Sequence, residues 1–311
     1  HTVFFDFNSF EDRMGKVLEY FLLTQTRKFG TRLFVFDKNH SARLLLNKMG
    51  GKYFTMNQLE KVNTDLAVDR SPRLALNPFS LEASAYNMSF LAAWCGLLIS
   101  PDVVLDDKAR GILRAAVEQV YSMPASERNL PNMVALVTQK DAVLAESLER
   151  WVGQGVYAKL FDFAQDSLDM GVDMIGFDMT SSLAKPAYML PLFSYLMHRV
   201  IDTIDNKPTI IVINEAWDLL ENGFFAPRLE SLLEMLKQKN VMVIFTTSQV
   251  SNCGETATLS TIMSQAATQI YIPDEMPVPY QSKGLGLNEK DAFMLSTMQR
   301  QKGDFLLKQN G

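Results

Sequence analysis

One stretch of this sequence leaves few choices of fold: a run of β-branched residues that ends in a polar pair, within Thr209–Leu220 (TIIVINEAWDLL). Such a continuous apolar run is typical of a strand buried on both faces, as in a parallel sheet between helical layers. The run ends at Asn214 and Glu215. In nucleotide-hydrolysing proteins a strand of this kind delivers carboxylates to a metal and to the attacking water. The usual pair is Asp-Glu, so the Asn-Glu pair raises the question of whether catalysis is kept.

Other short apolar runs also predict buried strands, and helical patterns lie between many of them. The predicted strands are Thr2–Phe7, Arg32–Asp37, Arg73–Leu76, Met174–Met179, Thr209–Glu215, Val241–Thr247, Gln269–Pro273 and Asp304–Lys308. The clearest helix has leucines spaced i, i+3, i+4, i+7 at Leu229, Leu232, Leu233 and Leu236. This alternation predicts an α/β fold with a mostly parallel sheet and helices on both faces.

The middle of the chain lacks strand signals and is rich in Leu, Ala and Met. We therefore predict an α/β domain made of residues 1–79 and 169–311, interrupted by an all-helical insertion at residues 80–168. No apolar run reaches the ~20 residues that a membrane helix needs, and Pro186 and Pro191 interrupt the later run. Because the chain starts directly on strand-like sequence without Met, we expect it to be a segment of a longer protein.

The overall composition is that of an ordinary globular protein, with 47% hydrophobic and 21% charged residues. The net charge of −5 argues against a general polyanion binder, so we expect no strong binding of nucleic acid. Cys95 and Cys253 make no metal-ligand or redox spacing, and neither do His40 and His198. No metal site is predicted from these residues.

Several fragments, in order along nearly the whole chain, resemble one family. They are FVFDKNHSARLLLNKMGGKYFTM, the NPF of Asn77–Phe79, FDMT at Phe177–Thr180, LMHRVIDTID, IIVINEAWDLL, LKQKNVMVIFTTS and GDFLLKQ. Together they look like the C-terminal ATPase domain of the CagE/TrbE/VirB family, the fourth VirB component of type IV secretion and conjugation systems.

The resemblance implies a RecA-like P-loop NTPase fold, with ATP and Mg²⁺ as the family's ligands. It further implies a place at the cytoplasmic face of the bacterial inner membrane. The implied partners are other type IV secretion ATPases and the inner-membrane channel components, in a homo- or hetero-oligomer. An arginine finger is also conceivable in a RecA-like ring, but Arg110, Arg199 and Arg300 cannot be ranked from the sequence.

The first expected nucleotide motif, the phosphate-binding loop, departs from its pattern GxxxxGK[ST]. The chain reads HTVFFDFNSFEDRMGKVLEYFLLTQ, in which Gly15 is the one remaining glycine and Lys16 is a candidate for the phosphate lysine. Val17 then stands where a hydroxyl would bind magnesium. The acidic residues Glu11 and Asp12 would repel a triphosphate. The sequence therefore predicts a degenerate Walker A motif.

Two further positions depart from the family pattern. Asn214 occupies the Walker B aspartate position, where an amide is a weaker partner for a hard dication, and Glu215 is a vestigial or residual base. A glutamine that senses the γ-phosphate is expected after Val241–Thr247, where the chain has Ser248 and then Gln249. Asp37 and Lys38, after an earlier strand, are candidates for the rim of the site.

We therefore predict a pseudo-ATPase that keeps the fold as a structural or regulatory subunit. The alternative is an active ATPase that energises assembly or substrate transfer, binding nucleotide through Lys16, Glu215 and residues of a partner subunit. A third class, a DNA translocase, would require a basic channel and salt-sensitive DNA binding.

Overall fold

The computed structural model describes residues 2–6, 13–55, 74–100, 105–180, 186–216, 226–247, 257–273, 287–299 and 302–309. The chain divides into two compact units. Unit 1 consists of His1–Tyr53, Val172–Thr180 and Ile204–Gly311, and unit 2 of Phe54–Gly171 and Ser181–Thr203. The predicted insertion, residues 80–168, falls within unit 2.

Unit 1 is built on an eight-stranded sheet with the strand order β3-β4-β2-β5-β6-β1-β7-β8. The strands are β1 (Thr2–Asp6), β2 (Arg32–Asp37), β3 (Lys52–Phe54), β4 (Met174–Asp178), β5 (Thr209–Asn214), β6 (Val241–Thr247), β7 (Ala266–Tyr271) and β8 (Leu306–Gln309). The run from β4 through β2, β5, β6 and β1 to β7 is parallel, and β8 pairs antiparallel with β7. The predicted mostly parallel sheet is confirmed.

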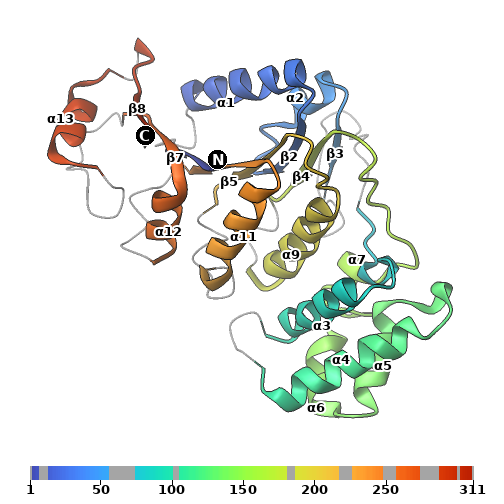
Figure 1. Ribbon diagram of the computed structural model, residues 1–311. Helices are drawn as coiled ribbons and strands as arrows, with labels where there is room; N and C mark the ends of the chain where they lie inside the picture. The colour runs from blue at the N-terminus through green and yellow to red at the C-terminus, as the bar shows by residue number, and fades with distance from the viewer. Residues whose placement is uncertain are drawn as a thin grey trace. The chain divides into compact units, whose positions relative to one another are not determined.

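Helices lie on both faces of this sheet (Figure 1). In unit 1 they are α1 (Arg13–Thr26), α2 (Arg43–Lys48), α11 (Ala226–Gln238), α12 (Ala257–Gln265) and α13 (Glu289–Thr297), with a 3₁₀ turn at Arg27–Phe29. Figure 1 shows α1 and α2 on one face and α11 and α12 on the other. Helix α11 buries Leu229, Leu233 and Leu236, the side predicted from the leucine spacing.

One strand prediction is wrong, and one strand was missed. Residues Leu74–Leu76 form no strand, because their backbone groups do not make the repeated hydrogen bonds of a strand pair. Instead, Ala75 N donates to the Ser167 side chain at Oγ, and Ser167 N donates to Ala75 O, both at 2.8 Å. Strand β3 was not predicted, since it has only three residues and follows a glycine pair. A run that short gives too little alternation to distinguish a strand from a loop.

Unit 2 is helical, and its described residues between 80 and 168 contain no strand. Its helices are α3 (Ala85–Ile99), α4 (Asp107–Tyr121), α5 (Leu130–Thr138), α6 (Ala142–Glu149), α7 (Ala158–Phe161) and α9 (Pro186–Asp202), with 3₁₀ turns at Pro78–Ser80 and Ala125–Glu127. Four helices begin at a side chain that accepts a bond from the first turn: Ser84, Asp106, Asn129 and Asp141. These caps satisfy N–H groups that a helix cannot bond internally.

The core of unit 2 contains large aromatic side chains, and the indole nitrogens of its two buried tryptophans are hydrogen-bonded. Trp94 and Trp151 are buried, and their Nε1 atoms donate to the carbonyls of Pro191 and Leu98, both at 2.9 Å. Pro191, expected to interrupt the apolar run, lies inside α9, so the helix continues through it. Among the described residues, no helix is both long enough and apolar enough to cross a membrane.

Candidate functional site at the carboxyl ends of the strands

Four neighbouring parallel strands of unit 1 end in polar side chains on the same edge of the sheet. Strand β2 ends at Asp37, β4 at Asp178 and β5 at Asn214, and β6 contributes Thr246. All four side chains are buried. Ligands of open α/β sheets bind outside this edge, so it is the candidate site.

Asp37 is the centre of a buried hydrogen-bond network. Its Oδ1 accepts from Ser41 Oγ at 2.5 Å and from Asn214 Nδ2 at 3.1 Å. Its Oδ2 accepts from Ala42 N at 2.9 Å and from the Tyr53 hydroxyl at 2.7 Å. Four donors thus surround a fully buried carboxylate, and hydrogen bonds of this kind offset the cost of burying a charge.

Tyr53, on β3, is held as a donor by its surroundings. Burial raises the pKa of its hydroxyl well above the usual value, and the carboxylates of Asp37 and Asp178 raise it further, whereas Arg43 acts in the opposite direction. The phenol therefore keeps its proton at any pH at which the protein functions, and it donates to Asp37 throughout that range.

Asn214 has both polar side-chain atoms engaged by the protein. Its Nδ2 donates to Asp37 Oδ1 at 3.1 Å and lies 3.4 Å from Ser41 Oγ. Its Oδ1 accepts from Thr246 Oγ1 at 2.9 Å. Because an ionised carboxylate can only accept, the amide nitrogen must be the atom that faces Asp37. Position 214, which the family resemblance makes the expected Walker B position, therefore carries a donor aimed at a neighbouring carboxylate.

Asp178 forms a second polar group at the same edge. Its Oδ1 accepts from Thr180 N at 3.0 Å, and its Oδ2 lies 3.4 Å from His40 Nδ1. His40 and Asn39 both have positive φ, 55° and 62°, and Asn39 N donates to Thr180 Oγ1 at 2.8 Å. Left-handed conformations of residues other than glycine are uncommon and concentrate at sites where the surrounding structure dictates the backbone.

The other two candidates at this edge follow the ends of β2 and β5. Lys38 comes directly after Asp37 and is partly buried. Glu215 is also partly buried and has a positive φ of 54°, and the next residue, Ala216, donates from its N to Thr246 O at 3.1 Å. The chain therefore turns sharply as it leaves β5 at Glu215.

The phosphate-loop candidates lie only partly within the described structure. The backbone of Gly15 and Lys16 belongs to α1, but the Lys16 side chain lies outside the described part, as do residues 7–12. The Val17 side chain is 58% exposed and carries no oxygen that could bind a metal. Ser248 and Gln249 also lie outside the described residues, beyond the end of β6.

Magnesium is the metal that the family resemblance implies, and the described donors at this edge do not fit it. Magnesium prefers carboxylate oxygens and water. Asn214 directs an N–H group toward Asp37, and its single, neutral oxygen already accepts a bond from Thr246. Within the described ranges, no group of three or more His, Cys, Asp or Glu residues is placed to hold a metal ion.

The three arginines considered for a finger role have separate surroundings. Arg199, in unit 2, lies 3.3 Å from Asp166 and donates to the Tyr195 hydroxyl at 2.9 Å. Arg110 pairs with Asp107 on the same helix at 2.6 Å. Arg300 lies outside the described residues.

Sequence reasoning missed three members of the network: Ser41, Tyr53 and Thr246. Tyr53 lies on the strand that was not predicted, and a serine or threonine near a strand end carries no signal of its own. Asp178 was present in the quoted FDMT fragment but was given no role. Its position as the last residue of a buried strand was the signal that could have found it.

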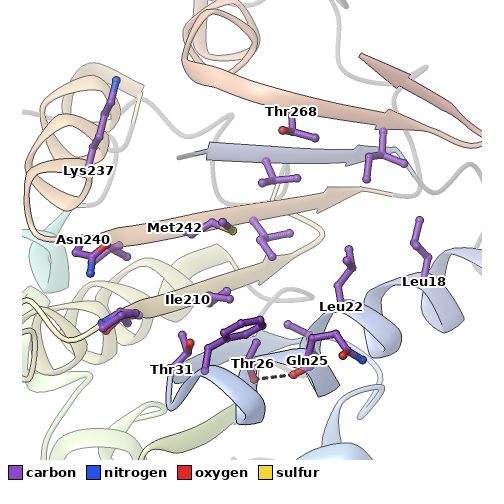
Figure 2. Close-up of a pocket in the computed structure, with 18 of the residues that line it drawn as sticks. Leu18, Leu22, Gln25, Thr26, Thr31, Ile210, Lys237, Asn240, Met242 and Thr268 are labelled. Atoms are coloured by element: carbon purple, nitrogen blue, oxygen red, sulfur yellow. Dashed lines mark hydrogen bonds between the residues drawn. The ribbon is translucent and has the colours of Figure 1, made fainter. Parts of the chain in front are cut away.

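A large apolar cavity of about 870 Å³ lies elsewhere in unit 1 (Figure 2). It is lined by Leu18 and Leu22 of α1, and by Ile210 and Met242 near the amino ends of β5 and β6. None of the predicted nucleotide-site residues lines it. The cavity therefore belongs to the opposite half of the sheet from the polar edge.

Comparison with known proteins identifies the relatives of this chain. No protein-family profile matches it. The type IV secretion system protein VirB4 of Bartonella quintana is 28% identical over 299 residues, covering 94% of this chain and 36% of that protein. PtlC of Bordetella pertussis, also a type IV secretion system protein, is 26% identical over 275 residues, covering 83% of this chain and 32% of that protein. The chain thus spans about a third of the length of these relatives.

Solved structures support the same relationship at the level of the fold. VirB4 of Thermoanaerobacter pseudethanolicus superposes with a TM-score of 0.71 at 15% identity, covering 96% of this chain and 84% of that one. The plasmid coupling protein TrwB, in complex with the non-hydrolysable ATP analogue ADPNP, gives a TM-score of 0.55 at 13% identity, covering 87% and 70%. The expected RecA-like P-loop NTPase fold is confirmed. Over nearly its whole length, the chain is similar to the VirB4 proteins of type IV secretion systems.

Proposed function

We propose that this protein is a type IV secretion subunit that keeps the ATPase fold as a structural or regulatory pseudo-ATPase. The observation that carries the proposal is the Asn214 side chain, whose nitrogen is bonded to Asp37 and whose oxygen is bonded to Thr246. A residue engaged in this way is a poor support for the magnesium shell of a nucleotide.

The chemistry of phosphoryl transfer makes this loss important. Catalysis there depends on positioning and on electrostatic stabilisation by metal, lysine and backbone N–H groups. Val17 supplies no hydroxyl, and the sequence around Gly15 and Lys16 lacks the glycines that let a backbone wrap phosphates. Loss of both metal supports is expected to abolish turnover even where the fold is intact.

Glu215 is the strongest argument for the alternative, an active ATPase that energises assembly or substrate transfer. It is retained at the position of the catalytic base, and TrwB, a relative in fold, is described in complex with an ATP analogue. In this alternative, nucleotide contacts would come from Lys16, Lys38, Ser248 or Gln249 and from a partner subunit. We favour a structural role for Glu215 at the turn that follows β5.

Membership of a secretion system implies partners. We propose that the protein works at the cytoplasmic face of the inner membrane, with other type IV secretion ATPases and channel components, in a homo- or hetero-oligomer with an active relative. The net charge of −5 gives no general attraction for nucleic acid, so DNA is not the proposed ligand.

Titration of the purified protein with Mg-ATP by calorimetry separates the two functions. We expect no heat of binding up to millimolar nucleotide, whereas an active P-loop ATPase measured in parallel should bind. Micromolar binding, together with ATP turnover that Glu215→Gln abolishes, would instead establish the enzyme. The same titration with ADP and without magnesium would show whether any affinity depends on the metal.

A further inference from the structure

The buried network around Asp37 leads to an inference about why position 214 is an asparagine. We propose that the Asn214 amide takes the place of a divalent cation, so that a single nitrogen atom closes a latent metal site between positions 37 and 214. This inference deepens the proposed function and rests on it for the claim that the natural chain holds no metal at this edge.

The distances explain what an aspartate would do here. Asn214 Nδ2 lies 3.1 Å from Asp37 Oδ1. Asparagine and aspartate have the same shape, so Asn214→Asp would put two carboxylate oxygens at that separation in a buried place. Two carboxylates so close cannot both ionise without a cation between them, and in its absence they share a proton.

Asp37 cannot easily move away from such a neighbour. Ser41 and Ala42 donate to it from the turn before α2, at 2.5 and 2.9 Å, and Tyr53 donates to it from β3 at 2.7 Å. Asp178, on the neighbouring strand, adds a further negative charge, which raises the pKa of Tyr53 together with Asp37. Arg43 is a basic side chain that lowers the pKa of Tyr53. The Asp37 carboxylate is thus held in place facing position 214, where an N–H group or a cation is a favourable neighbour and a second carboxylate is not.

A double substitution should restore the pairing of one carboxylate with one N–H donor between positions 37 and 214, without a cation. In Asp37→Asn combined with Asn214→Asp, the amide oxygen at 37 can accept from Ala42 N and from the Tyr53 hydroxyl. The amide nitrogen can then donate to the carboxylate at 214, and Ser41 can turn its hydroxyl. Thr246 Oγ1 can still donate to the second oxygen at 214. The swap therefore reverses the bond between positions 37 and 214 and the bonds of the Ser41 hydroxyl, and it keeps the direction of the bonds from Ala42, Tyr53 and Thr246.

The experiment compares four proteins without nucleotide: the natural chain, Asn214→Asp, the swap, and the control Asn47→Asp. Asn47 is an exposed residue of α2, so its substitution adds the same charge at the surface of the same unit. Thermal midpoints are measured in EDTA and in millimolar Mn²⁺, at mildly alkaline pH so that a shared proton cannot replace the cation. Bound Mn²⁺ is counted by electron paramagnetic resonance.

We expect Asn214→Asp to melt roughly 4–10 °C lower than the natural chain in EDTA, and Mn²⁺ to restore most of that loss. This variant alone should bind one Mn²⁺ at the edge. The natural chain, the swap and Asn47→Asp should melt at temperatures that do not depend on Mn²⁺. If Asn214→Asp does not fold in EDTA, folding on addition of Mn²⁺ would count as the same result.

Two results would overturn the inference: an Asn214→Asp protein as stable in EDTA as the natural chain, or one whose stability Mn²⁺ leaves unchanged. If Asn214→Asp fails to fold even with Mn²⁺ while the swap folds, the proposed cation site would also be overturned. The test is independent of the proposed function, because Mg-ATP binding by the natural chain would refute the pseudo-ATPase without altering the response of Asn214→Asp to Mn²⁺ in the absence of nucleotide.

Discussion

His198 lies on α9 with its imidazole ring stacked on two aromatic rings of α3. The centroid distances are 3.7 Å to Phe90 and 5.0 Å to Tyr86, and Nε2 lies 2.8 Å from Asn87 Oδ1. Burial lowers the pKa of His198 to about 4, and the nearby Arg199 charge contributes to the lowering. Asp202, 3.6 Å away and partly exposed, is the one acidic group recorded beside the ring among the described residues.

This histidine should make the stability of the protein depend on pH. The folded pKa of about 4 lies below the ordinary value of 6.5, so protons bind the unfolded chain more tightly. Stability from the neutral ring is complete above about pH 6.5 and is lost as pH falls toward 4, by about 2–3 kcal/mol. We expect urea unfolding to show a stability difference between the natural chain and His198→Gln that narrows over this range, because glutamine keeps a donor for Asn87 but does not titrate. A difference that stays constant with pH would contradict the assignment.

At the level of elements, Gly176 allows β4 to lie close to α2 and β3. A Cβ at this position would come within 2.5 Å of both Leu46 Cδ1 and Tyr53 Cδ2. The leucine tip can shift, but the tyrosine ring is rigid and its hydroxyl is bonded to Asp37. The absence of a side chain at Gly176 therefore matters twice. It allows β4 to pack against its neighbours, and it leaves room for the Tyr53 ring that bonds to Asp37.

Gly176→Ala is expected to destabilise unit 1 by about 1–3 kcal/mol, the usual cost of overpacking a core. Gly111→Ala is the matched control, since Gly111 is exposed within α4 and its added Cβ would meet no atom within 4 Å. That substitution should stabilise unit 2 by about 0.5–1 kcal/mol. Urea unfolding measures both, and an unchanged Gly176→Ala protein would show that Tyr53 can move without cost.

The strands that the sequence predicted well are those with continuous apolar runs. Strands β2 and β6 match their predicted bounds, and β5 ends one residue earlier than expected, at Asn214. The short β3 was missed, and an apolar segment at Leu74–Leu76 was taken for a strand although its backbone bonds to Ser167. Local patterns identify a buried segment, but only the tertiary partners decide whether it joins a sheet.

The candidate site was predictable in part for the same reason. Asp37 and Asn214 were found because each ends a strong strand. Their direct bond joins residues 177 positions apart and could not be read from local sequence. Tyr53 and Thr246 were missed because their roles depend on what they face. The predicted insertion at residues 80–168 remains a proposal, although unit 2 contains it.

At the scale of the whole molecule, the described chain is two compact units with separate cores. Unit 1 has the sheet, and unit 2 has Trp94 and Trp151 among its helices. The chain passes from one unit to the other several times along its sequence, so neither unit is a continuous segment. This arrangement raises the question of whether the two units unfold together or separately.

We expect the two units to respond separately to substitutions in their own cores. Native-state hydrogen exchange reports the opening of each region through its own amides. Gly176→Ala should lower protection in β2, β4 and β5, roughly tenfold for each ~1.4 kcal/mol lost, and leave α4 and α5 unchanged. Gly111→Ala should raise protection in α4 and α5 and leave the strands unchanged. If either substitution changed the protection of both sets of amides equally, the chain would open as one cooperative unit. A substitution at the polar edge of unit 1 would then also change the stability of unit 2.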